Sequence, residues 1–281
     1  MSVHLPDGLV DAVRNRKCVL FVGSGLSSLA GYPSWSRLIE RLVAEAKRVP
    51  SARTDGLEVI EARGDYLMLA EFARTTLGAS DYTDILKEEL GHPVMPSAAH
   101  RLIAATDYRG IITTNYDRLF EIAIPQVRSW APLTFTHEAV SLMGSALFTP
   151  DMFLFKMHGD LASPASIVLS SRDYERLLLR SPHVRALLFG VFLNYKLLFV
   201  GYGLRDPDFN LILRELTLIF ENYVPKHYAL VPNPGTFEQD HLLRQMNIQL
   251  IGYDPADDHA AVMDVLRELQ VIAPAPIPLA A

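Results

Sequence analysis

The sequence predicts an α/β fold in which helices cover both faces of a parallel sheet and a helical module is inserted. Short apolar runs alternate with segments of helical periodicity along most of the 281 residues. This alternation is typical of parallel sheets with crossover helices. By contrast, the stretch from about residue 50 to residue 105 shows helical patterns without a convincing strand. We interpret that stretch as the inserted module.

Short apolar runs bounded by polar or turn residues are the predicted strands. In chain order they are Cys18–Val22, Gly110–Thr113, Met152–Met157, Ile167–Leu169, Leu197–Val200, His227–Val231 and Ile248–Ile251. Helical patterns outside the module cover Trp35–Arg48, Asp206–Phe220, Thr236–Met246 and Asp258–Leu269. Ligands bind at the carboxyl ends of strands in such sheets, so polar residues that follow the runs are the candidate site.

Within the module, helical patterns cover Leu57–Leu77, Tyr82–Leu90 and Ser97–Ala105. The chain is long enough for one large domain that carries such a module. We therefore predict a single domain over residues 1–270. Residues 271–281 are rich in Ala and Pro without a helical period, and we expect a docked or frayed tail there.

The composition bears on partners. Apolar residues make up 49% of the chain and charged residues 21%, and the mean hydropathy is +0.15. This is apolar for a soluble protein, so we expect a homo-oligomer in which other subunits cover part of the surface. The formal net charge of -6 argues against a broad basic face for nucleic acid. A local basic patch is still compatible with that charge, so direct nucleic-acid binding stays open.

Cys18 is the only cysteine, which excludes an internal disulfide and a four-cysteine zinc site. Its place in an apolar run favours plain packing. The chain shows no charged and apolar leader, and the apolar stretch 184–202 is interrupted by Arg185, Asn194 and Lys196. We therefore expect a cytoplasmic protein without a membrane span or a bound metal.

The first apolar run leads into a glycine-rich turn, Val19-Leu-Phe-Val-Gly-Ser-Gly-Leu-Ser-Ser28. Gly23 and Gly25 can take positive φ and let a diphosphate approach the backbone, and the next helix offers free N–H groups. A Rossmann fingerprint has a third glycine where Ser28 stands and an acidic residue about 20 positions later. Neither is clearly present, which disfavours a dehydrogenase. The Rossmann-like turn either binds a nucleotide or is a tight turn without a ligand.

A second polar set, Thr113, Thr114, Asn115 and Asp117, follows the next predicted strand. The amide of Asn115 can both donate and accept hydrogen bonds, which suits holding a ribose or a water. Asp117 either takes part in the site or caps the helix that follows.

A third set ends the run Met152-Phe-Leu-Phe-Lys-Met-His-Gly-Asp160. Gly159 leaves room beside the ring of His158, and Asp160 is a candidate orienting partner. A lone histidine after a strand is more often structural, but its place at the same sheet edge favours a general base.

A fourth set follows Leu197–Val200, where Gly201 and Gly203 can pass a phosphate or ribose close to the backbone. Arg205 offers a charge for a phosphate or an acidic neighbour. We predict Asp206 as the N-cap of the next helix, with Pro207 at its first position.

These motifs occur in the order and approximate spacing of the nucleotide motifs of the sirtuin family. They are Gly23-Ser-Gly-Leu-Ser27, Thr113-Thr-Asn-Tyr-Asp117, His158-Gly159 and Gly201-Tyr-Gly-Leu204. The chain resembles a sirtuin-like domain across nearly its whole length. More narrowly, the Thr-Asn-Tyr-Asp, His-Gly-Asp and Gly-Tyr-Gly-Leu-Arg-Asp-Pro-Asp-Phe motifs look like the prokaryotic branch that hydrolyses NAD in antiphage defence.

The resemblance implies a role for each matching position. The NAD diphosphate and its neighbouring ribose would be held by Gly23, Ser24, Gly25 and Ser27. The nicotinamide–ribose side would be faced by Asn115 and Asp117, with Thr114 standing where the deacylases have Gln. The ribose hydroxyls would be contacted by His158, and the adenosine half would be lined by Gly201, Gly203 and Leu204.

The implied activity is an NAD glycohydrolase that gives nicotinamide and ADP-ribose, with Asn115 and His158 as catalytic residues. Protein-deacylating sirtuins carry a four-cysteine zinc module, which one cysteine cannot build, so we expect no zinc and water as the acceptor. Residues after 270 leave no room for a sensor, so we expect a separately encoded partner such as a hexameric ATPase or helicase.

Two alternatives stay open at this stage. One is a protein deacylase or ADP-ribosyltransferase, which would consume NAD only with an acyl-peptide or a target protein. The other is a non-catalytic subunit that senses NAD or ADP-ribose, or that helps a partner act on nucleic acid.

Overall fold

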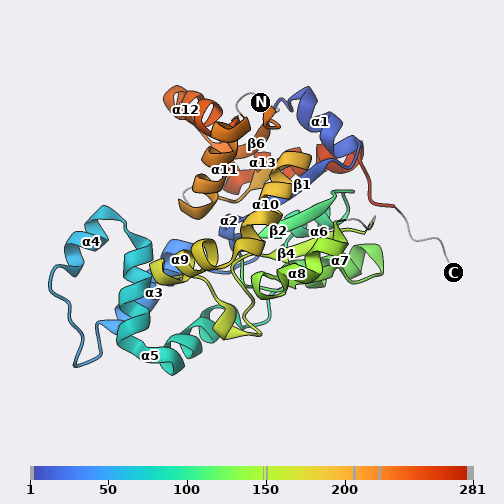
Figure 1. The fold of residues 1–281 in the computed structure, drawn as a ribbon. Helices are drawn as coiled ribbons and strands as arrows, with labels where there is room; N and C mark the ends of the chain where they lie inside the picture. Colours follow the sequence, from blue (N-terminus) through green and yellow to red (C-terminus); the bar gives the residue numbers. More distant parts are fainter. Residues whose placement is uncertain (1–2, 148, 150, 205–206, 221–222, 277–281) are drawn as a thin grey trace.

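The computed structural model describes residues 3–147, 149, 151–204, 207–220 and 223–276. The strands in this part of the chain form one seven-stranded parallel sheet in the order β3-β4-β2-β1-β5-β6-β7. Their bounds are β1 Cys18–Val22, β2 Gly110–Thr113, β3 Leu133–Thr136, β4 Phe153–Lys156, β5 Lys196–Val200, β6 His227–Pro232 and β7 Ile248–Tyr253. The predicted α/β class with a parallel sheet is confirmed (Figure 1).

The central strands are buried on both sides, because helices cover both faces of the sheet. The first face carries α8 (Val140–Ala146), α9 (Ser171–Arg180), α10 (Pro182–Asn194), α11 (Pro207–Phe220) and α12 (Thr236–Met246). The second face carries α1 (Asp7–Arg14), α6 (Ala98–Ala104), α7 (Leu119–Arg128) and α13 (Ala256–Ile272). Short helices α2 (Ser24–Ser28), η1 (His137–Ala139) and η2 (Pro164–Ser166) lie in connections.

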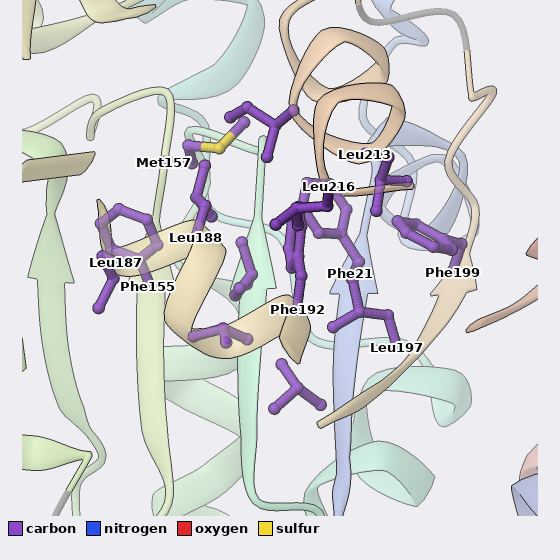
Figure 2. Packing of buried hydrophobic residues seen from close by; sticks show 14 of the residues in the cluster. Phe21, Phe155, Met157, Leu187, Leu188, Phe192, Leu197, Phe199, Leu213 and Leu216 are labelled. Carbon is purple, nitrogen blue, oxygen red and sulfur yellow. The ribbon is translucent and has the colours of Figure 1, made fainter. Parts of the chain in front are cut away.

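Alternate residues of each strand supply the two cores, as the period of a strand requires. In β1, Val19 and Phe21 point to the first face, while Cys18, Leu20 and Val22 point to the second. Figure 2 shows the first-face cluster, in which Phe21 and Phe199 of the sheet pack against Phe192 of α10 and Leu216 of α11. Burial raises the pKa of the Cys18 thiol, so this side chain stays neutral and serves packing.

Helices α3 (Trp35–Ala46), α4 (Leu57–Arg63) and α5 (Tyr66–Leu90) pack around a third core and project beyond the sheet at the lower left of Figure 1. We call these three helices the helical module. It differs from the predicted module of residues 50–105, because α3 belongs to it and α6 packs on the second face of the sheet instead. The predicted interruption between Leu77 and Tyr82 corresponds to Gly78, which has non-helical angles inside α5. The predicted helix Leu57–Leu77 is two helices, because left-handed Gly64 ends α4 and the Asp65 side chain accepts the Met68 N–H at the start of α5.

The predicted strand Ile167–Leu169 is wrong. This segment is buried and extended but pairs with no strand of the sheet. Ile167 and Leu169 pack into the core of the helical module, while Val168 packs into the first-face cluster. Its apolar character therefore comes from lying between two cores.

The sequence interpretation also missed β3, Leu133–Thr136, which pairs with β4 at the edge of the sheet. Its residues are exposed or half-buried, so they lack the apolar run by which buried strands are found. Within the described residues, no helix combines the length and apolar character needed to cross a bilayer.

Candidate functional site

The direction in which strands are added to the sheet reverses at β1. After β1 the chain builds β2, β3 and β4 on one side of it, and then crosses to the other side to build β5, β6 and β7. Open α/β sheets bind ligands where the strand order reverses, outside the carboxyl ends of the strands. The predicted polar sets follow β1, β2, β4 and β5, which are adjacent strands at this edge.

The turns after β1 and β5 pack directly against each other. The N–H groups of Gly23 and Gly25 donate to the carbonyls of Val200 and Gly201, at 3.2 and 2.9 Å. A Cβ atom at Gly23 would lie 2.6 Å from the Gly201 carbonyl oxygen, and one at Gly201 would lie 2.4 Å from the amide nitrogen of Leu26. Glycine is therefore required on both sides of this contact.

The expectation that Gly23 and Gly25 take positive φ is wrong. Gly23 is extended, with φ -112° and ψ -179°, and Gly25 lies inside α2, whereas Gly201 has the positive φ of +61°. In this conformation the N–H of Gly25 is already donated to Gly201, and that of Leu26 to the Gly23 carbonyl at 3.1 Å. These two N–H groups are therefore not free for a diphosphate.

Ser27, Asn115 and Asp117 form one hydrogen-bonded set at the ends of β1 and β2. The side-chain nitrogen of Asn115 donates to Ser27 Oγ at 2.8 Å and to the Gly23 carbonyl at 3.1 Å. Ser27 Oγ in turn donates to Asp117 Oδ2 at 2.7 Å. Asn115 is only 8% exposed, so its amide orientation is fixed within a nearly closed site.

Asp117 caps helix α7, as one of its two sequence interpretations predicted, but it uses only one carboxylate oxygen to do so. Its Oδ1 accepts the N–H of Leu119 at the start of α7, at 3.0 Å, while Oδ2 faces Ser27. The same carboxylate thus starts a helix and holds the serine.

His158 lies two residues beyond β4 and is 2% exposed. Its Nδ1 lies 3.5 Å from the hydroxyl of Tyr174 on α9, and the two rings meet edge to face at 4.9 Å. Gly159 has φ +90°, and a Cβ atom there would lie 2.2 Å from the Ser166 carbonyl oxygen. The space that glycine leaves is thus occupied by backbone at Ser166.

Asp160 is not the orienting partner of His158 that the sequence suggested. Its Oδ2 pairs with the ammonium of Lys156, and its Oδ1 accepts the N–H of Ala162 at 2.7 Å. Lys156 also donates to the carbonyls of Tyr116 and Asp117, at 3.2 and 2.6 Å.

The remaining ligand positions serve mainly as local structure in this conformation. The Thr114 N–H donates to the Val22 carbonyl at 3.2 Å, and the Ser24 carbonyl accepts the Ser28 hydroxyl at 3.1 Å. Leu204 packs its side chain into the first-face cluster. Around Gly203, no atom lies within 4 Å of a Cβ atom built there. The proposed nucleotide contacts of these positions stay predictions.

Arg205 and Asp206 lie outside the described residues. Helix α11 begins with Pro207, as predicted. Among the described residues, no three His, Cys, Asp or Glu side chains are arranged to hold a metal ion.

A pocket of about 370 Å³ is lined in part by Val168, whose N–H donates to the His158 carbonyl. Its walls come from η1, α8, α9 and the loop before α9, with His137, Ser166, Val168, Asp173 and Arg176 among the lining residues. None of the predicted site residues lines this pocket.

Sequence reasoning missed two residues that contact the candidate site. One is Tyr174, whose position on α9 gave no signal. The other is Lys156, for which a signal existed, because lysine is almost never fully buried unless it is paired and this one stands inside an apolar run.

Comparisons with known proteins place the chain among sirtuin-like sequences. A family model described as a SIR2-like domain matches residues 109–251. The NAD(+) hydrolase ThsA of Bacillus cereus (strain MSX-D12) is 29% identical over 222 residues, covering 78% of this chain and 44% of the relative. Defense-associated sirtuin 2 of Bacillus subtilis is 27% identical over 278 residues, covering 93% of this chain and 26% of the relative.

The chain thus spans less than half the length of each of these relatives. A crystal structure of a SIR2 homologue in complex with NAD aligns with a TM-score of 0.45 and 13% identity, covering 96% of this chain and 94% of that chain. The match to the family model covers half of the chain and includes the segments of Asn115, His158 and Gly201. The chain therefore belongs to the SIR2-like domain family.

Proposed function

We propose that this chain hydrolyses the bond between ribose and nicotinamide in NAD, giving nicotinamide and ADP-ribose. The observation that carries the proposal is the Ser27–Asn115–Asp117 set at the reversal point of the sheet, at the same edge as His158. Relatives named NAD(+) hydrolase ThsA, from Bacillus cereus and Acinetobacter baumannii, support it.

The geometry suits this chemistry. Because the Asn115 nitrogen donates to Ser27 and to the Gly23 carbonyl, its amide oxygen is left to accept a hydrogen bond from water. Loss of nicotinamide creates an oxocarbenium-like ribose, which this water attacks. His158 assists by taking a proton from a ribose hydroxyl, and general-base help of this kind contributes roughly 100-fold to 10,000-fold.

Water is the proposed acceptor, in preference to a protein lysine. The single cysteine cannot build the zinc lobe that the deacylating branch carries. The apolar segment Ile167–Leu169 is enclosed between two cores, so it offers no free strand edge to which a peptide could add.

Access to the site requires movement, because Asn115 and His158 are 8% and 2% exposed. The helical module packs on Tyr116, Leu119 and Ile167, which come from the segments around these two residues. We propose that displacement of the module from these contacts admits NAD.

The proposed setting is antiphage defence, in a homo-oligomer that acts with a separately encoded partner such as a hexameric ATPase or helicase. The name of defense-associated sirtuin 2 supports the setting. Self-association is supported by exposed apolar side chains at α11, α12 and the segment between α11 and β6, since exposed apolar patches mark interaction surfaces. The largest exposed fractions there belong to Leu218 (80%), Tyr223 (90%) and Phe237 (81%).

The test follows nicotinamide by chromatography after the purified chain is mixed with NAD, with and without an acylated peptide. Asn115→Ala and His158→Ala are compared with His241→Ala, which changes an exposed histidine on α12. Binding of NAD is measured on all four proteins by calorimetry. We expect release without peptide, reduced more than about 100-fold in the first two variants and unchanged in the third.

The other outcomes identify the rival functions. Release that requires acylated peptide, with transfer of the acyl group to ADP-ribose, would show a deacylase. Binding of NAD without nicotinamide release, with or without peptide and partner, would show a sensing subunit. Undiminished release by His158→Ala would overturn the assignment of that residue.

A further inference from the structure

Lys156 is the last residue of β4 and is 0% exposed. Leu154, two residues earlier on the same side of the strand, packs into the second-face core. An ammonium group in such surroundings is costly unless hydrogen bonds and opposite charges satisfy it. The hydrogen-bond and ion-pair partners of the Lys156 ammonium therefore indicate its role.

The ammonium of Lys156 is shared between two loops and one helix. It donates to the backbone carbonyls of Tyr116 and Asp117, at 3.2 and 2.6 Å, in the loop that carries Asn115. It also pairs with Asp160, two residues after His158, and with Glu121 of α7 at 3.0 Å. One side chain thus connects the segments of both predicted catalytic residues.

The two carboxylates do not have the same part in this arrangement. Burial raises the pKa of Glu121 although the nearby Lys156 charge opposes that shift, so this carboxyl holds its proton more readily than an exposed glutamate. Asp160 pairs with the same ammonium through Oδ2, and its other oxygen accepts the Ala162 N–H and so shapes the turn after His158. Of the two carboxylates, only Asp160 therefore extends the lysine contact to the histidine segment.

We propose that Lys156 is a positioning residue, which fixes the Asn115 loop relative to His158 through its contacts with Tyr116, Asp117 and Asp160. The reaction needs the water held by Asn115 and the proton acceptor on His158 to meet the same ribose. A displacement of about 1 Å between such groups can reduce turnover about 100-fold. This inference rests on the proposed NAD hydrolysis for its activity readout.

The decisive comparison is between Asp160→Asn and Glu121→Gln. Each variant removes one carboxylate from the same lysine and leaves the other as its counter-ion. We expect Asp160→Asn to lower kcat by about 100-fold with KM changed less than about threefold, because positioning acts after substrate is bound. We expect Glu121→Gln to keep kcat within about threefold of the wild type, since α7 carries neither predicted catalytic residue.

Thermal unfolding of both variants separates positioning from stability. Equal losses of kcat in the two variants, or a loss that follows the change in Tm, would show that the lysine is only part of a buried structural ion cluster. The Lys156→Arg variant tests whether the charge alone is sufficient, because it keeps the charge but changes the reach of the side chain. Its kcat should fall although the positive charge is preserved.

A readout without turnover distinguishes this inference from the proposed function. In protein labelled with ¹⁵N-histidine, the His158 ring signals are assigned by their absence from His158→Gln. Asp160→Asn should shift these signals and Glu121→Gln should not. A wild type that releases no nicotinamide would remove the proposed function, whereas unshifted His158 signals in Asp160→Asn would overturn the positioning role.

Discussion

At the scale of single residues, Ser27 fixes the orientation of the Asn115 amide in the candidate site. Its hydroxyl accepts from the Asn115 amide and donates to Asp117, and it is almost completely buried. A hydroxyl that fills both roles fixes the amide nitrogen of Asn115 toward Ser27 and leaves the amide oxygen on the other side. The orientation that the proposed water needs is therefore set by a neighbouring side chain.

Ser27→Ala should reduce nicotinamide release roughly 10-fold to 100-fold and lower the free energy of unfolding by about 1–2 kcal/mol, because Asp117 loses a buried donor. Ser28→Ala is the matched control, since this exposed hydroxyl only donates to the Ser24 carbonyl. Nicotinamide chromatography and urea unfolding measure both effects. Equal activity of the two variants would contradict the role of Ser27.

Gly201→Ala should destabilise the fold by at least about 3 kcal/mol, through a backbone clash and a strained left-handed φ. The built Cβ atom lies 2.4 Å from Leu26 N at φ +61°. Gly203→Ala has open space around the built atom and should change stability by less than about 0.5 kcal/mol. Urea midpoints compare the two variants, and similar midpoints would show that the turns do not need to meet.

At the scale of elements, the contact between β5 and β6 contains a titratable group. His227 is the first residue of β6 and is fully buried, and its Nδ1 accepts the Leu197 N–H of β5 at 3.1 Å. Burial, with a smaller contribution from the Lys196 charge, lowers the pKa of His227 to about 3. The folded chain therefore keeps this ring neutral while the unfolded chain protonates it near pH 6.5.

This difference makes stability depend on pH. The stabilisation is complete above pH 6.5 and is lost as pH falls toward 3, because the unfolded state then binds the extra proton. From pH 7.5 to pH 5, this histidine should contribute a loss of about 2 kcal/mol in the free energy of unfolding. His227→Gln, which retains an acceptor but does not titrate, should remove that part of the slope in urea unfolding. An unchanged slope would contradict a buried neutral His227, and exposed His241→Gln serves as control.

Most elements could be predicted because buried strands and amphipathic helices leave a periodic signal. Thr236–Met246 was predicted with its observed bounds, and the break in α5 was visible around Gly78. The segment Ile167–Leu169 was mistaken for a strand because two cores, with no sheet partner, bury its alternate sides. Strand β3 was missed because an edge strand without full burial lacks an apolar run.

The candidate site could also be predicted only in part from the sequence. Asn115, Asp117 and Ser27 were selected from sequence and lie together, because polar residues after parallel strands share one edge. Tertiary contacts such as Lys156 with the Asp117 carbonyl and Tyr174 with His158 join distant segments. No local spacing encodes such pairs, so their partners required the structure.

At the scale of the whole molecule, the apolar surface near α11 and α12 predicts self-association. We expect the wild type to sediment as an oligomer at micromolar concentration, and Leu218→Ser with Phe237→Ser to shift it toward smaller species. Burying such side chains contributes about 1.5–3 kcal/mol each, so losing two should be visible. Val271→Ser changes a similarly exposed residue on α13, at the opposite face of the sheet, and serves as control. A wild type that sediments as a monomer would contradict the prediction.

The contact between the turns after β1 and β5 also has a consequence during synthesis. A ribosome must translate the helical module and the first half of the sheet before the acceptors at Val200 and Gly201 exist for the Gly23 turn. A nascent chain, or a fragment that stops before Lys196, therefore lacks the paired turns of the proposed NAD site. If the mature protein depletes this nucleotide, the cell that makes it is protected from its own unfinished copies.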